Sequence, residues 1–173
     1  NRLAAAGLPR VEAASFVRDD RVPQMARAEE VVDRIDRRDG TEYSGLVLNE
    51  QGYERFARTG LDRVNATLGA TESFNQRNGQ MSRDEAVAQA ESIVATAKEP
   101  VTVTISVAFG CPFEGEVDAG EVVALVERLG AEEVVLADTI GVAGPNHVRG
   151  LVERVRGLGR RTGFHGHNTR NTG

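Results

Sequence analysis

The stretch VTVTISVAF, residues 101–109, decides the fold class of this sequence. Apolar residues at every second position alternate with small or polar ones, which predicts a β-strand. Pro100 precedes this strand and ends a helical pattern that begins with a capping-box motif at Ser82 and Glu85. A helix followed at once by a strand is the repeating element of parallel α/β folds.

The same alternation continues on both sides of residues 101–109. Residues 1–8 are typical of the second half of a helix that ends near Gly7. Asp118 and Pro145 mark helix starts, and Gly130 marks a helix end. The predicted strands are 10–17, 43–48, 62–69, 101–109, 133–137 and 162–169, and the predicted helices are 28–35, 53–57, 82–97, 118–129 and 145–155.

Strict alternation predicts parallel strands with helical crossovers, in either an open doubly wound sheet or a (β/α)8 barrel. No G-x-G-x-x-G motif follows the first strand, so the dinucleotide-binding form of the open sheet has no support. A barrel takes about 250 residues and eight units, and roughly six units fit here. We therefore predict an incomplete (β/α)8 TIM barrel, with residues 1–173 forming a single catalytic domain truncated at both ends.

Composition excludes several classes of partner. The chain has 173 residues, 40% of them apolar, and a net charge of −5. It has no apolar run near the roughly 20 residues of a membrane span, and its basic residues are scattered among acidic ones, which disfavours a membrane or nucleic-acid partner. Cys111 is the only cysteine, so no internal disulfide can form, and we predict a reducing, cytoplasmic location.

Two of the three histidines lie in the last predicted strand, at His165 and His167. Side chains at positions i and i+2 of a strand point to the same face, so the two imidazoles would lie together. Neutral imidazole is a common ligand of divalent metals. The alternative is one packed and one solvent-exposed histidine; the clustering of histidines favours the metal site.

The active site of a barrel forms at the carboxyl ends of its strands. We place Glu12 and Asp138 there as catalytic candidates that project into the mouth with the histidines, because carboxylates are costly to bury without a cation or metal. Ser15, Thr139 and Asn168 are candidates for substrate contact. Threonine and asparagine at such positions more often cap helices, as we expect for Asn49, Thr71 and Thr139. We expect Cys111 to be a small loop residue and His147 to be exposed and uninvolved.

Four segments of the sequence resemble those of 3-hydroxy-3-methylglutaryl-CoA lyases, in order and spacing. They are VPQM at 22–25, GCPFEG at 110–115, DTIGV at 138–142 and HGHNT at 165–169. The lyases belong to a metal-dependent TIM-barrel family that includes isopropylmalate and homocitrate synthases. The H-x-H and Asp-Thr-x-Gly elements are shared across that family, whereas the other two segments are typical of the lyase branch.

The resemblance implies that His165 and His167 bind Mg2+ or Mn2+, that Glu12 lies at the metal site and that Asp138 is a polar residue of the active site. It also implies an acyl-CoA substrate, a role in leucine degradation and ketone-body formation, and a homodimer or larger homo-oligomer. Asn168 stands where many lyases have aspartate. The family's Arg-Asp-Gly motif would precede residue 1, and its loop with the catalytic cysteine would follow residue 173.

The resemblance therefore implies a lyase that cleaves a 3-hydroxy-3-methylglutaryl-CoA-like substrate to acetyl-CoA and a keto acid, acetoacetate. A divalent ion can acidify the substrate hydroxyl while a base removes its proton and an acid protonates the acetyl-CoA enolate. Because two imidazoles give Mg2+ no anionic ligand, we expect a polypeptide of only these residues to bind metal poorly and to lack activity.

Three alternatives stay open. A Claisen-condensing synthase of the same family would form the carbon–carbon bond instead. A non-catalytic barrel fragment would act as a scaffold. A zinc amidohydrolase also uses H-x-H in a barrel, but on the first strand and with further histidines later, so this alternative has the least support.

Overall fold

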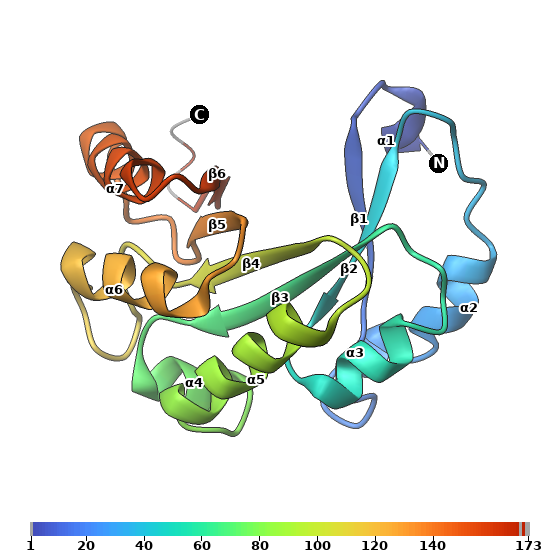
Figure 1. Cartoon of the computed structure of the whole chain (residues 1–173), viewed down its shortest axis with the longest axis horizontal. Helices are drawn as coiled ribbons and strands as arrows, with labels where there is room; N and C mark the ends of the chain where they lie inside the picture. Colours follow the sequence, from blue (N-terminus) through green and yellow to red (C-terminus); the bar gives the residue numbers. More distant parts are fainter. Residues whose placement is uncertain (1, 170, 172–173) are drawn as a thin grey trace.

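The computed structural model describes residues 2–169 and 171 and contains one parallel sheet in the order β1-β2-β3-β4-β5-β6 (Figure 1). Neighbours in the sheet are also neighbours in the chain, as expected when each strand is followed by a crossover. The strands are β1 (Arg10–Ser15), β2 (Glu42–Val47), β3 (Arg63–Gly69), β4 (Val101–Ser106), β5 (Glu133–Asp138) and β6 (Arg161–Gly166).

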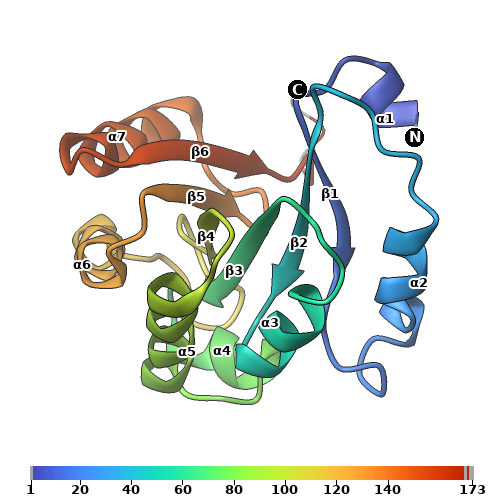
Figure 2. The ribbon, with the colours of Figure 1, turned by 45° about the vertical axis from the view of Figure 1, so that its right-hand side comes forward.

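The helices lie outside the curved sheet, and the strands surround a concave side (Figure 2). They are α1 (Arg2–Ala5), the 3-10 turn η1 (Pro23–Met25), α2 (Ala28–Asp33), α3 (Glu50–Phe56), α4 (Glu72–Asn78), α5 (Arg83–Thr96), α6 (Ala119–Leu129) and α7 (Pro145–Gly157). The predicted parallel α/β fold is confirmed as a half-barrel. No described helix is long and apolar enough to cross a membrane.

Alternation along the strands separates two faces of the sheet. Val103 and Ile105 of β4 are fully buried in the hydrophobic core on the helix side. The concave side is polar: Asn65 of β3 donates to Glu12 of β1 at 2.7 Å and accepts from Thr104 of β4 at 2.8 Å. The first of these bonds spans β2, which the curvature of a barrel wall makes possible.

The amino-terminal end of the concave side is occupied by charged residues that begin their strands. Glu133 of β5 forms ion pairs with Arg10, Arg63 and Arg161, and Glu42 of β2 pairs with Arg10 and Arg63. The opposite charges of these residues pair with one another, so we assign this cluster a structural role at the amino-terminal end of the sheet. The chemistry of the molecule therefore has to be sought at the carboxyl ends of the strands.

The main departures from the predicted elements are local. The strand predicted over residues 101–109 ends at Ser106, because Val107 adopts a left-handed backbone with φ of +51°. A β-branched residue is disfavoured there, which marks a strained turn at the end of β4. Helix α4 was not predicted. The helix predicted at 53–57 begins earlier, at Glu50, and the helix stop predicted at Gly7 is confirmed by its φ of +83°.

Candidate active site

The two imidazoles lie side by side at the carboxyl end of β6. The ring centroids of His165 and His167 are 4.8 Å apart, and the ring planes are inclined by 27°. This confirms that the i, i+2 spacing brings both rings to one face. Both residues are exposed on the side of the sheet where parallel β/α proteins bind their ligands.

A backbone contact fixes the orientation of His167. Its Nδ1 lies 3.0 Å from the carbonyl oxygen of Asp138, at the end of the neighbouring strand β5. A carbonyl oxygen only accepts, so Nδ1 carries the proton, and in the neutral form of the imidazole the lone pair is on Nε2. Metal-binding histidines are oriented in this way by a partner on the other ring nitrogen. The residue fits a metal ligand.

Glycine at position 141 lets two loops approach each other at this point. Its φ is +67°, and a Cβ there would lie 2.8 Å from the His167 carbonyl oxygen and 2.7 Å from Thr169 Oγ1. Only glycine accommodates both the backbone conformation and the contact. The loop after β5 therefore supports the segment that carries His167.

The carboxylate of Asp138 is used by its own loop. It is 4% exposed, and its two oxygens accept the backbone N–H groups of Val142 and Ala143, each at 2.9 Å. Both oxygens are thus directed to the loop that follows β5, and the expected projection of the side chain into the mouth stays a prediction. Asp138 shapes the loop through its carboxylate and holds His167 through its carbonyl oxygen; its predicted catalytic role stays a prediction.

Glu12 lies on the concave side but not at a strand end. It is the third residue of β1, which continues to Ser15, so the expected strand-end position was wrong. The carboxylate is exposed and accepts the 2.7 Å hydrogen bond from Asn65. The side chain therefore keeps acceptor capacity for a substrate or metal, and its role stays a prediction.

Thr139 joins the ends of β4 and β5. Its hydroxyl accepts the backbone N–H of the strained Val107 at 2.8 Å, so it does not cap a helix as expected for this residue. Because a hydroxyl can accept and donate at once, its proton remains available to a ligand. Asn49 does cap α3, whereas the Thr71 hydroxyl donates to Cys111 Sγ at 3.1 Å.

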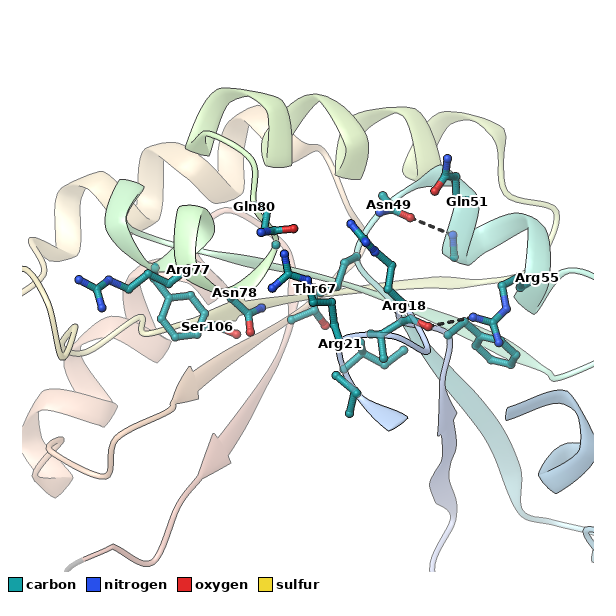
Figure 3. A pocket seen from close by; sticks show the side chains of 18 of the residues that line it. Arg18, Arg21, Asn49, Gln51, Arg55, Thr67, Arg77, Asn78, Gln80 and Ser106 are labelled. Carbon is teal, nitrogen blue, oxygen red and sulfur yellow. Dashed lines mark hydrogen bonds between the residues drawn. The ribbon is translucent and has the colours of Figure 1, made fainter. Parts of the chain in front are cut away.

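A cavity of about 590 Å³ opens at the carboxyl ends of β1 to β5 (Figure 3). Its volume suits a drug-sized or larger ligand. Its lining includes Leu46, Thr67, Ser106 and Thr139, which come from or directly follow four successive strands. The imidazole pair lies outside this lining but adjoins it, because the carbonyl that holds His167 belongs to the residue before Thr139.

Arginines line this cavity. Arg18, Arg21, Arg55 and Arg77 follow its length, with Arg77 and Arg55 at opposite ends of the view (Figure 3). Two of them are neutralised within the protein: Arg18 by Asp20, and Arg55 by Glu29 and Asp19. Among the ion pairs of the described residues, none includes Arg21 or Arg77. The cavity therefore offers an anionic ligand two guanidinium groups that form no ion pair within the described part of the chain.

The other sequence candidates are not among the residues that line this cavity. Ser15 ends β1 and is half-buried, and Asn168 is exposed and donates to the side chain of Asn171 at 3.2 Å. Cys111 lies in the loop between β4 and α6, as expected, and is buried. His147 is exposed, with its ring edge-on to Phe109.

Sequence reasoning missed the arginines and helix α4. The signal for the helix was the polar run from Glu72 to Asn78, followed by Gly79. The connection from β3 to this helix is held by Asn75, which is 4% exposed. Its side chain accepts a hydrogen bond from the backbone N–H of Gly69 and donates one to the backbone carbonyl of Gly69. The arginines reach one cavity only through the tertiary fold.

Comparison with known proteins decides the family. The HMGL-like family profile matches residues 1–173. The chain belongs to the HMGL-like family. It is 39% identical to a hydroxymethylglutaryl-CoA lyase of Pseudomonas mevalonii over 87% of its length, and 35% identical to an (R)-citramalyl-CoA lyase of Chloroflexus aurantiacus over 99%.

Solved structures show the same architecture. The HMG-CoA lyase from Acenitobacter baumannii, solved in complex with coenzyme A and 3-methylmalate, superposes with a TM-score of 0.94 at 35% identity and covers the whole of this chain. The chain covers 59% of that structure, 52% of the Pseudomonas mevalonii enzyme and 60% of the Chloroflexus aurantiacus enzyme. It therefore spans half to three fifths of these relatives.

Proposed function

We propose that this chain forms the substrate-binding half of a metal-dependent lyase that cleaves a 3-hydroxy-3-methylglutaryl-CoA-like acyl-CoA to acetyl-CoA and acetoacetate. The observation that carries the proposal is the oriented imidazole pair beside the arginine-lined cavity. The similarity of the chain to hydroxymethylglutaryl-CoA lyases, one of them solved with coenzyme A, supports the same substrate class.

His165 and His167 would hold the divalent ion, Mg2+ or Mn2+. The fit rests on the Nε2 lone pair that the Asp138 carbonyl leaves exposed on His167. Among the described residues, no group of three or more His, Cys, Asp or Glu side chains is placed to hold a metal ion. When bound, the ion supplies a Lewis acid that lowers the pKa of the substrate hydroxyl.

The residues of the chain would then divide the remaining work. A base removes the hydroxyl proton, the electrons of the C2–C3 bond move into the thioester enolate, and an acid protonates that enolate to acetyl-CoA. Glu12 is our candidate for the proton transfer at the hydroxyl, because its exposed carboxylate faces the concave side. The Thr139 hydroxyl is placed to donate to a substrate oxygen, and Asp138 keeps the loop and His167 in position.

The cavity would bind the CoA moiety. Arg21 and Arg77 have charges that no ion pair among the described residues neutralises, and guanidinium groups are suited to phosphate oxygens. The apolar side chains of Leu46 and Leu48 line the same cavity and suit the less polar pantetheine arm. We also propose a cytoplasmic location, a place in leucine degradation and assembly as a homo-oligomer; the single cysteine suits a reducing compartment.

The test is metal-dependent turnover by the full-length enzyme. We expect Mn2+ or Mg2+ to support release of acetyl-CoA and acetoacetate from 3-hydroxy-3-methylglutaryl-CoA, and a chelator to stop it. His167→Ala should abolish turnover, whereas His147→Ala, an exposed histidine on α7, should retain it. Metal-independent turnover, or condensation of acetyl-CoA with an α-keto acid in place of cleavage, would contradict the proposal.

A further inference from the structure

The loop between β4 and α6 forms a small closed turn that is attached to helix α4. Cys111 and Gly115 exchange backbone hydrogen bonds of 2.7 and 2.9 Å, which close the turn. Thr71, at the start of α4, donates to Cys111 Sγ at 3.1 Å, and the backbone N–H of Ser73 donates to Glu114 at 2.6 Å. The turn is thus fixed relative to α4.

A third contact lies near the end of the same helix. The guanidinium carbon of Arg77 lies 4.2 Å from the centroid of the Phe113 ring. Phe113 is 45% exposed, so burial of apolar surface contributes only part of the free energy that holds this side chain in place. A cation over an aromatic face is attracted by the ring quadrupole.

The Phe113 ring differs from a carboxylate partner in one respect that matters here. An ion pair, such as that of Arg55 with Glu29, restrains an arginine and also cancels its charge. An aromatic ring restrains the guanidinium and leaves its full charge available to a second partner. Arg77 also lines the cavity, and Figure 3 shows its side chain at one end of the lining, extending away from the other labelled residues. Its restrained charge therefore lies at the outer edge of the proposed binding site.

We infer that Phe113 is a positioning residue: it holds Arg77 at the outer edge of the cavity so that the guanidinium binds the phosphates of the CoA moiety there. This inference rests on the proposed function, because the phosphates belong to the acyl-CoA substrate. It assigns the loop at residues 111–115 to substrate affinity and not to the bond-breaking step. A purely structural Phe113 would instead affect all substrates alike.

The experiment uses the full-length enzyme and two substrates that carry the same 3-hydroxy-3-methylglutaryl group, one as the CoA thioester and one as the pantetheine thioester, which lacks phosphates. In Phe113→Leu we expect KM for the CoA thioester to rise about two- to fivefold, the size of an exposed cation–π contact, with kcat unchanged. The pantetheine thioester should show unchanged kcat/KM. Phe113→Tyr, which keeps the ring, should retain the original KM.

Two further variants isolate the arginine. Arg77→Ala should raise KM for the CoA thioester about tenfold or more, the size of a lost hydrogen bond to a charged group. The double variant with Phe113→Leu should lose no more than Arg77→Ala alone. Unchanged KM in Phe113→Leu, or an equal loss with both thioesters, would overturn the positioning role while the proposed function stands. Absence of acetyl-CoA release from either thioester by the unmodified enzyme would overturn the proposed function, and the inference with it.

Discussion

Replacing Glu133 with alanine should destabilise the protein through the charged cluster at the amino-terminal end of the sheet. The carboxylate is 9% exposed, accepts a 2.9 Å hydrogen bond from Thr102 and is hydrogen-bonded by Arg10. Arg161 and Arg63 lie 3.5 and 3.9 Å from it. Its removal leaves three arginines with Glu42 as the remaining acidic member of the cluster.

The size of the effect follows from burial. Removing one partner of a buried ion pair costs about 3–5 kcal/mol. Here the side chains of Arg10 and Arg161 are 34% and 74% exposed and can turn toward water, so we expect about 2–3 kcal/mol. For a chain of this size, that corresponds to a fall in Tm of about 4–12 °C.

Urea and thermal unfolding of the full-length protein measure this loss. Glu91→Ala is the matched control, because Glu91 also pairs with an arginine, Arg128 at 3.0 Å, but both side chains are well exposed. A surface pair of this kind is worth about 0–1 kcal/mol. Equal losses in the two variants would refute the argument that burial makes the Glu133 cluster important.

The same cluster makes stability depend on pH. Burial raises the pKa of Glu133, but hydrogen bonds from Arg10 and Thr102 and the nearby arginine charges lower it more, so it lies below the ordinary value of 4.5. A carboxylate whose pKa is lowered in the folded state stabilises the fold fully above its unfolded pKa. The stability difference between the original protein and Glu133→Gln should therefore be complete at pH 7 and disappear as pH falls below about 4.5.

Two further variants test single positions by thermal unfolding. Thr67→Val should raise stability by about 1 kcal/mol, because the buried Thr67 hydroxyl has no hydrogen-bond partner among the described residues. Thr104→Val, which removes a bonded hydroxyl, should lower it, and a loss in both would contradict this reasoning. Gly141→Ala should lower the free energy of unfolding by about 2 kcal/mol or more, because position 141 has a left-handed backbone and the new Cβ would lie 2.7 Å from Thr169 Oγ1. The same variant should weaken metal binding. Gly144→Ala has open space and should be nearly neutral; similar losses in the two glycine variants would count against the close approach.

The order of strands and helices could be predicted because it depends on local pattern. Apolar residues alternate with polar ones in 101–106, and this period predicts the strand although residues 102–106 are all buried. Capping motifs at Ser82 and Asp118 also act within four residues of the chain, and both form as predicted. The pairing of His165 with His167 follows in the same way from strand geometry.

The rest of the site depends on contacts between distant residues. Glu12 meets Asn65 across 53 positions of the chain, so nothing near Glu12 in the sequence indicates this contact. The direction of the Asp138 carboxylate depends on the path of the loop that follows it. The left-handed turn at Val107 opposes the local preference of valine, so the continuing apolar alternation predicted a strand beyond Ser106.

The central claim is that His165 and His167 together bind the catalytic divalent ion. Pulsed electron paramagnetic resonance of Mn2+ bound to the full-length enzyme, with histidine labelled by 15N, counts the imidazole nitrogens on the ion. The account predicts two, and one after His167→Ala, with Nε2 as the bonded atom of His167. Bound Mn2+ that shows no histidine nitrogen in the unmodified enzyme would contradict it.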